Sequence, residues 1–243
     1  PVPTCLIDIV FPGDTNHHGT LFGGAGFALM DRVAFIAATR HGRVPFVTAS
    51  CERIDFKAPA RIGQIIEVMA RPLWAGRKSL TVEVEMTAET LVGGERHLCT
   101  RGLFNMVAVP DRDVPEDWCL ADLPYGVDPG PVEGQTTMTE IVFADQSNAF
   151  GNMFGGEAIA AMTKAAFVCA TRHCRMLTVV ASSRQINFHY AIKVGSIIDT
   201  IARIRSTGRT SMVVGVELWS EDVLTGERQS VATGEFVMVA VDE

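Results

Sequence analysis

Cysteine is scarce in this sequence. Six cysteines occur among 243 residues, and no two of them form a Cys-x-x-Cys pair. That is too few for a disulfide framework, and it provides no structural zinc motif. His17 and His18 lie close to Asp14, but no third spaced ligand follows them. We therefore expect no metal, and we expect the reducing cytoplasm as the compartment.

Long apolar runs and a surplus of basic residues are also missing. No stretch reaches the roughly 18 uninterrupted apolar residues of a membrane-spanning helix. The first residues, Pro1 to Thr4, show no basic segment followed by an apolar run, so no signal peptide is expected. Lys and Arg number 21 against 28 Asp and Glu, a net charge of −7. This balance argues against nucleic acid as a partner, and we expect no membrane partner either.

The sequence contains one unit written twice. At an offset of 132 residues, Phe22-Gly23-Gly24 coincides with Phe154-Gly155-Gly156, and 44 of the 106 pairs between 4–109 and 136–241 are identical without a gap. A period this long exceeds that of solenoid repeats, which run to about 50 residues. The pattern predicts two homologous domains, 1–109 and 136–243.

The segment 110–135 between the copies has a different composition. It holds five prolines and seven acidic residues against a single basic one, Arg112. Such a composition is typical of an extended linker. Four larger apolar residues within it suggest that part of it packs on a surface: Trp118, Leu120, Leu123 and Tyr125. The linker carries six of the seven net negative charges, so the two copies are close to neutral.

Each copy is predicted to form one helix and an antiparallel sheet. In the first copy, apolar residues at helical spacing and five alanines indicate a slim helix over 23–41. Alternating residues and glycine-containing turns predict strands at 4–11, 47–57, 64–74, 78–88 and 97–109. The second copy repeats this with a strand at 136–143 and a helix at 155–173. The expected class is α+β, a sheet wrapped around one helix, with the two sheets paired edge to edge.

The loop that enters each helix offers a candidate site. Asn16 recurs as Asn148, and the glycine pair Gly23-Gly24 recurs as Gly155-Gly156. Glycines at a helix start let a ligand approach unpaired N–H groups at the positive end of the helix dipole. This arrangement suits a polarised carbonyl or an oxyanion. Tight packing of the helix on the sheet explains the same glycines without a ligand.

Asp31 is the second candidate, because it interrupts an otherwise apolar helix. It follows Gly23 by eight residues, about 12 Å along the helix, so it cannot serve its own helix start. If the two helices run antiparallel and adjacent, Asp31 shares a site with Asn148, Gly155 and Gly156. The other site would then combine Asn16, Gly23 and Gly24 with Thr163. Because Thr163 is no acid, we expect one competent site and one degenerate site. An ion pair of Asp31 with a cation is the structural alternative.

The basic residues near strand ends are candidates for phosphate contacts. Most of them are expected to be solvated surface. Arg77 and Arg209, each in a Gly-Arg-x-Ser turn, are the first choices, and Lys57 is a third.

The run from Asp14 to Gly24, followed by Met30-Asp31, resembles the signature of hotdog-fold acyl-CoA thioesterases, in particular the brain-type acyl-CoA hydrolases with two hotdogs. Phe56-Lys57-x-Pro59 fits as well. Thr163 in place of a second acid and Gln146 in place of a counterpart to Asp14 depart from the pattern.

The resemblance implies a tandem hotdog fold and hydrolysis of an acyl-CoA to a free acid and CoA. It implies that Asp31 is the acidic residue and Asn148 its partner across the interface, that no cofactor is needed beyond the CoA of the substrate, and that three double hotdogs assemble. Two alternatives stay open. One is a non-catalytic acyl-CoA-binding module. The other is a hotdog enoyl-CoA hydratase, in which Asp14 with His17 or His18 would form the required acid and histidine pair.

Overall fold

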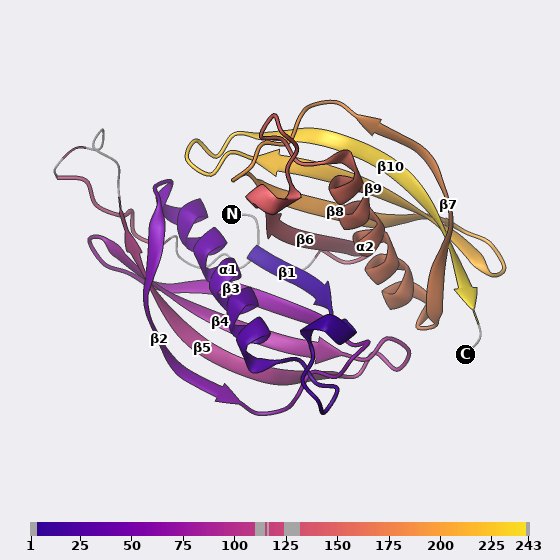
Figure 1. Ribbon diagram of the computed structural model, residues 1–243, viewed down its shortest axis with the longest axis horizontal. Helices are drawn as coiled ribbons and strands as arrows, with labels where there is room; N and C mark the ends of the chain where they lie inside the picture. The colour runs from indigo at the N-terminus through magenta and orange to yellow at the C-terminus, as the bar shows by residue number, and fades with distance from the viewer. Residues whose placement is uncertain (1–3, 110–114, 116, 124–131, 242–243) are drawn as a thin grey trace. The chain divides into compact units, whose positions relative to one another are not determined.

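The computed structural model describes residues 4–109, 115, 117–123 and 132–241 (Figure 1). The chain forms two compact units. The first comprises Pro1–Glu89, Glu95–Gly130 and Val223–Gly226, and the second comprises Thr90–Gly94, Pro131–Asp222 and Glu227–Glu243. No helix among the described residues is long and apolar enough to cross a membrane.

The sheet of the first unit has five antiparallel strands in the order β1-β3-β4-β5-β2. After β1 (Thr4–Ile9), a short 3-10 turn (Pro12–Asp14) leads through a loop to helix α1 (Gly23–Gly42). The remaining strands follow along the chain: β2 (Phe46–Phe56), β3 (Ile65–Ala75), β4 (Ser79–Glu89) and β5 (Arg96–Ala108).

The second unit repeats this topology with the strand order β6-β8-β9-β10-β7. Its elements in chain order are β6 (Gln135–Ile141), α2 (Gly155–Cys174), β7 (Leu177–Phe188), β8 (Ile197–Thr207), β9 (Ser211–Glu221) and β10 (Arg228–Val241). The predicted α+β class and the two hotdog-like units are confirmed. Most element boundaries agree within one residue. The first strand of each copy ends two residues early, because a 3-10 turn begins at Pro12 and at Ala144.

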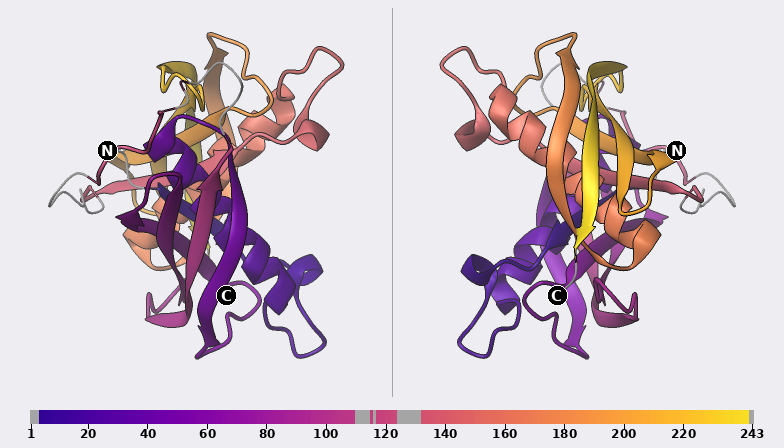
Figure 2. Two further views of the ribbon diagram at one scale, coloured as in Figure 1. Left: turned by 90° about the vertical axis from the view of Figure 1, so that its left-hand side faces the viewer. Right: turned by 90° about the vertical axis from the view of Figure 1, so that its right-hand side faces the viewer.

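Each sheet curves around its own helix (Figures 1 and 2). In β4, burial alternates strictly, and Leu80, Val82, Val84 and Met86 form part of a core that also includes Met30 of α1. The small side chains of the helix, such as Ala34 and Ala37, are buried and let it approach the sheet closely. The helix start is therefore held in a fixed position relative to the sheet.

Part of the segment 110–135 belongs to the first unit. Leu120 is buried in the core, and Trp118 and Leu123 pack against that core. The backbone N–H of Leu120 donates to the carbonyl of Arg77 at 3.0 Å. This confirms the expectation that apolar residues of this segment pack on a surface. Tyr125 lies outside the described residues.

Candidate functional site

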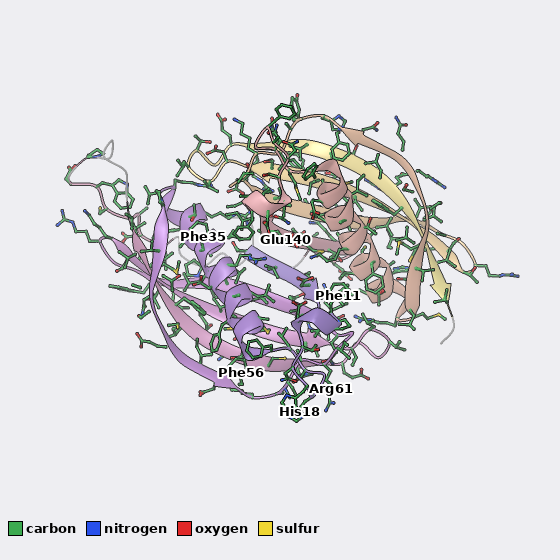
Figure 3. All side chains as sticks on the ribbon, in the orientation of Figure 1. Phe11, His18, Phe35, Phe56, Arg61 and Glu140 are labelled. Atoms are coloured by element: carbon green, nitrogen blue, oxygen red, sulfur yellow. The ribbon has the colours of Figure 1, made fainter. Side chains whose placement is uncertain are left out.

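The loop between β1 and α1 is shaped by Asn16. Its side-chain oxygen accepts hydrogen bonds from the backbone N–H of His18 at 2.9 Å and of Thr20 at 3.4 Å. Its side-chain nitrogen donates to the Thr20 hydroxyl at 3.0 Å. Both ends of the Asn16 amide are therefore engaged within the loop. Phe56, Arg61 and His18 lie around this entrance to α1 (Figure 3).

Asn148 shapes the corresponding loop of the second unit, but the loop does not use its side-chain nitrogen as a donor. Its side-chain oxygen accepts from the N–H groups of Phe150 at 2.9 Å and Asn152 at 3.2 Å. Asn152 stands where the first copy has Thr20, so the hydroxyl that occupies the Asn16 amide nitrogen has no counterpart. Within the described part of the chain, Nδ2 of Asn148 donates no hydrogen bond. The two asparagines therefore differ in the one group that could reach a ligand.

The start of α2 is also more accessible to a ligand than the start of α1. The first bond within α2 runs from the N–H of Ala158 to the carbonyl of Phe154, so the N–H groups of Gly155 and Gly156 have no acceptor inside the helix. A side chain at Gly156 would meet nothing within 4 Å, whereas one at Gly24 would meet the Phe22 ring at 2.7 Å. The start of α2 is thus open for close approach, and the start of α1 is covered at Gly24 by a phenyl ring.

Asp31 accepts a hydrogen bond of 2.5 Å from the hydroxyl of Thr48 on β2. The same hydroxyl lies 3.6 Å from the sulfur of Met106. Asp31 is partly exposed, and only eight of the 20 residues of α1 are buried, fewer than its apolar sequence suggests. The carboxylate is therefore oriented by a neighbouring strand and remains accessible.

The second unit has lost both members of this pair. The positions equivalent to Asp31 and Thr48 are Thr163 and Val180. The Thr163 hydroxyl donates to the Ile159 carbonyl one turn earlier in α2, at 2.8 Å. It is thus bonded to its own helix and offers neither a base nor a carboxylate.

The hydroxyls of Thr15 and Ser147 stabilise the turns in these loops. Thr15 donates to the carbonyl of Pro12 at 2.8 Å, and Ser147 donates to that of Ala144 at 2.6 Å. Burial raises the pKa of the Cys99 and Cys169 thiols, which keeps them protonated and poorly nucleophilic. No group of three or more potential metal ligands occurs among the described residues.

The candidate phosphate contacts lie at two different places. Lys57 follows Phe56, whose ring would come within 3.9 Å of a side chain at Gly23, so Lys57 lies at the end of β2 near the start of α1. Arg77 lies in the β3–β4 turn, and its carbonyl binds Leu120, which lies against Gly42 at the other end of the helix. Arg209 is exposed in the equivalent β8–β9 turn. Within the first unit, Arg77 and Lys57 are therefore not brought together.

Comparison with known proteins identifies the family of this chain. The pattern of the thioesterase superfamily matches residues 18–94 and 150–227, one match in each repeat. The chain belongs to the thioesterase superfamily. The crystal structure of an acyl-CoA hydrolase from Agrobacterium tumefaciens is 61% identical and superimposes with a TM-score of 0.92, covering 100% of this chain and 96% of that one.

Two curated relatives are similar over different lengths. The acyl-CoA thioester hydrolase YkhA of Bacillus subtilis is 38% identical over 106 residues, which is 44% of this chain and 62% of that protein. The human cytosolic acyl coenzyme A thioester hydrolase is 24% identical over 100% of this chain and 76% of its own length. The resemblance to hotdog thioesterases is thereby confirmed.

The role of Thr48 was not predicted from the sequence. A signal was present, because positions 31 and 48 change together between the two copies, from Asp and Thr to Thr and Val. The hydrogen bond between Asp31 and Thr48 gives that joint change its physical meaning.

Proposed function

We propose that this chain hydrolyses acyl-CoA thioesters to a free acid and CoA, at one competent site per chain. The observation that carries the proposal is the oriented carboxylate of Asp31, held by Thr48 and present in only one of the two repeats. The acyl-CoA hydrolase names of its relatives support the choice of substrate.

The proposed site combines Asp31 of the first unit with Asn148, Gly155 and Gly156 of the second. Asp31 lies about 12 Å along the helix from its own glycine pair. The start of α2 offers what Asp31 lacks, namely a free amide donor and open N–H groups.

In this site the thioester carbonyl would lie against the N–H groups of Gly155 and Gly156. These donors stabilise the negative charge that develops on the carbonyl oxygen when it is attacked. Asn148 would donate from Nδ2 to the same oxygen or to the attacking water. Asp31 has two possible roles. It either removes a proton from water that attacks the carbonyl carbon, or attacks that carbon itself and forms an anhydride that water hydrolyses. In both routes the C–S bond breaks and CoA leaves as its thiolate.

The second combination, Asn16, Gly23, Gly24 and Thr163, is proposed to be inactive. The Asn16 amide is occupied by Thr20, Phe22 covers Gly24, and Thr163 is bonded to its own helix. Arg77, Arg209 and Lys57 remain proposed contacts for the phosphates of CoA. No metal or redox cofactor is required by this chemistry.

A single preparation can test the reaction class. Release of free thiol from acyl-CoAs of short, medium and long chain length should be measured alongside hydration of an enoyl-CoA. We expect thiol release without hydration. Binding of acyl-CoA without turnover would overturn the proposal in favour of a binding module, and hydration would overturn it in favour of a hydratase.

We further propose that the chain acts in the cytoplasm as a trimer of double hotdogs. The assembly follows from the family resemblance. Light scattering coupled to gel filtration should then give three times the 26.3 kDa mass of the chain. A monomer mass would contradict it.

Thr48→Val should lower kcat about tenfold, because groups that orient a functional side chain typically contribute 10- to 100-fold. The variant keeps the shape of threonine but cannot donate to Asp31. Thr48→Ser should restore most of the rate, since serine retains the hydroxyl. Val180 already occupies the equivalent position in the second copy, so Val180→Thr is the matched control and should leave kcat unchanged. Steady-state kinetics with one acyl-CoA tests this series, and an unchanged kcat in Thr48→Val would refute the orienting role.

Gly156→Ala should lower kcat/KM about tenfold while the protein folds normally. The added methyl meets no protein atom within 4 Å, and alanine is at least as favourable as glycine in a helix. The methyl would instead occupy the space through which the carbonyl approaches the N–H groups. Gly24→Ala is the paired control at the inactive start, where Phe22 has to move, and its kcat/KM should stay within about twofold of the parent. Equal losses in both variants would contradict the assignment.

A further inference from the structure

The second sheet has a hollow on the face that points away from α2. Its volume is about 530 Å³, and residues from β7, β8, β9 and β10 line it. The lining residues are Arg184, Gln185, Asn187, Arg205, Gly215, Val216, Glu217, Thr233, Gly234 and Glu235. Gly215 of β9 is as buried as Val214 and Val216, and none of the lining residues belongs to α2 or to the loop before it. The hollow is therefore separate from the helix start and its loop.

Two irregularities in the strands create this hollow. The pairing of β8 with β9 shifts between Ile204 and Ser206, so Arg205 is the extra residue of a bulge. The pairing of β7 with β10 shifts opposite Glu235, which places Arg184 and Gln185 in a second bulge. Bulges re-aim side chains and are enriched beside functional sites. Here they bring two arginines from different strands to one depression.

Gly215 provides the floor of the hollow. A Cβ at Gly215 would lie 2.4 Å from the Nε of Arg205, so the arginine side chain lies across the bare backbone of β9. A glycine inside a strand weakens the sheet and often marks the close approach of another group. In this case the approaching group is the side chain of Arg205.

The arginines at the hollow differ in how closely they pair with carboxylates. Arg184 pairs with Glu235 at 3.2 Å, and Arg203 pairs with Glu217 at 3.4 Å. Arg205 lies 3.9 Å from Glu217, which Arg203 already engages, and it donates no hydrogen bond within the described residues. Arg205 is thus held by one long ion pair and by no hydrogen bond among the described residues. With Arg203 beside the hollow, three arginines surround the two glutamates Glu217 and Glu235, an excess of one positive charge.

The first repeat serves as an internal comparison. Leu73 stands in place of Arg205, Glu83 in place of Gly215, and Glu52 in place of Arg184. Arg101, which is Thr233 in the second repeat, forms ion pairs with Glu83 and Glu85. Gly215 and the two bulge arginines, Arg205 and Arg184, therefore belong to the second repeat alone. Because the first repeat has the same topology without these residues, the fold itself does not require them.

We propose that this hollow binds a phosphate-bearing small molecule, at a site separate from the proposed thioesterase site. A guanidinium group binds phosphate oxygens through two parallel hydrogen bonds, and Arg205 offers such a fork. Asn187 and Thr233 on neighbouring strands lie at the same depression and can donate to further oxygens. The lining contains no aromatic side chain, so the site recognises the phosphate group and not a stacked base.

Titration calorimetry of the full chain with inorganic pyrophosphate at low salt tests the proposal. We expect saturable binding in the parent, a Kd at least about tenfold weaker in Arg205→Leu, and no binding in Gly215→Glu. Both variants introduce the residue found in the first repeat. Arg101→Thr removes one arginine from the equivalent face of the first sheet and is the matched control, with a Kd within about twofold of the parent. Circular dichroism should confirm that each variant is folded.

Three results would overturn the proposal. The first is an absence of binding in the parent at millimolar pyrophosphate. The second is an equal weakening in Arg205→Leu and Arg101→Thr, which would indicate only general charge attraction. The third comes from the hydrolysis assay, in which we expect Arg205→Leu to leave the KM for acyl-CoA unchanged. A raised KM would show that the hollow holds the diphosphate of the substrate and is not a separate site. Binding of pyrophosphate is measured without turnover, so failure of the thioesterase proposal would not by itself affect this one.

Discussion

Replacing Asp31 with asparagine is expected to lower kcat about 10²- to 10⁴-fold, the range that a positioned general base contributes. Asparagine has nearly the shape of aspartate and can still accept the hydrogen bond from Thr48. The variant therefore removes the negative charge and the basic oxygen without leaving a cavity. KM should change little, because the substrate contacts outside Asp31 remain. Thiol release under saturating acyl-CoA measures the effect.

Thr163→Asn is the matched control for this variant. Thr163 occupies the position of Asp31 in the second repeat, is partly buried in the same way, and already lacks a carboxylate. Activity should stay within about twofold of the parent. If Asp31→Asn hydrolyses acyl-CoA at the parental rate, Asp31 is neither base nor nucleophile and the proposed reaction at this site is wrong.

The fold could be predicted from local patterns because each element carries its own signal. Leu80, Val82, Val84 and Met86 alternate with polar residues along β4, and every one of them is buried. Glycine-containing turns mark the strand ends, and the duplication allows each prediction to be checked in a second copy. The strand ends at Ile9 and Ile141 were missed because the apolar run continues into a 3-10 turn. Hydrophobicity alone does not distinguish the two conformations.

The site was only partly predictable, because its decisive contacts join residues that are distant in sequence. Asp31 stands out as an acid in an apolar helix, but its orientation depends on Thr48, seventeen positions later, on a strand whose pattern shows little alternation. The difference between Asn16 and Asn148 depends on a third residue, Thr20 or Asn152. Likewise, Arg205 and Gly215 meet only because a bulge shifts the register of β8 against β9.

The differences between the two repeats are complementary. The first unit has the Asp31 carboxylate and the Thr48 hydroxyl that orients it. Its Asn16 amide nitrogen is bonded to Thr20, and the Phe22 ring covers Gly24 at its helix start. The second unit loses the carboxylate and the hydroxyl but keeps a free amide and an open helix start. For the proposed reaction, each unit alone lacks groups that the other unit has. This division of roles favours a single shared site over two independent ones.

Asn148→Ala is expected to lower kcat/KM about 10²-fold, and Asn16→Ala less than about threefold. Loss of one donor to a developing oxyanion typically costs 10² to 10³ in rate. Of the two loop asparagines, Asn148 is the one whose Nδ2 donates no hydrogen bond among the described residues, and it can therefore act as that donor. The pair is closely matched, because each asparagine accepts two backbone N–H groups of its own loop. Loosening of the loop should therefore be similar in the two variants, so that the difference in rate reports the donor.

A second substitution separates the donor from the shape of the loop. Asn148→Asp keeps the oxygen that accepts from Phe150 and Asn152 but lacks the N–H donor, so the loop should persist while the rate still falls at least as far as in the alanine variant. The added negative charge lies where an oxyanion would form and so opposes the transition state further. Equal losses from Asn16→Ala and Asn148→Ala would show that both starts are used, and the single shared site would have to be abandoned. Recovery of the full rate in Asn148→Asp would reduce Asn148 to a residue that only shapes its loop.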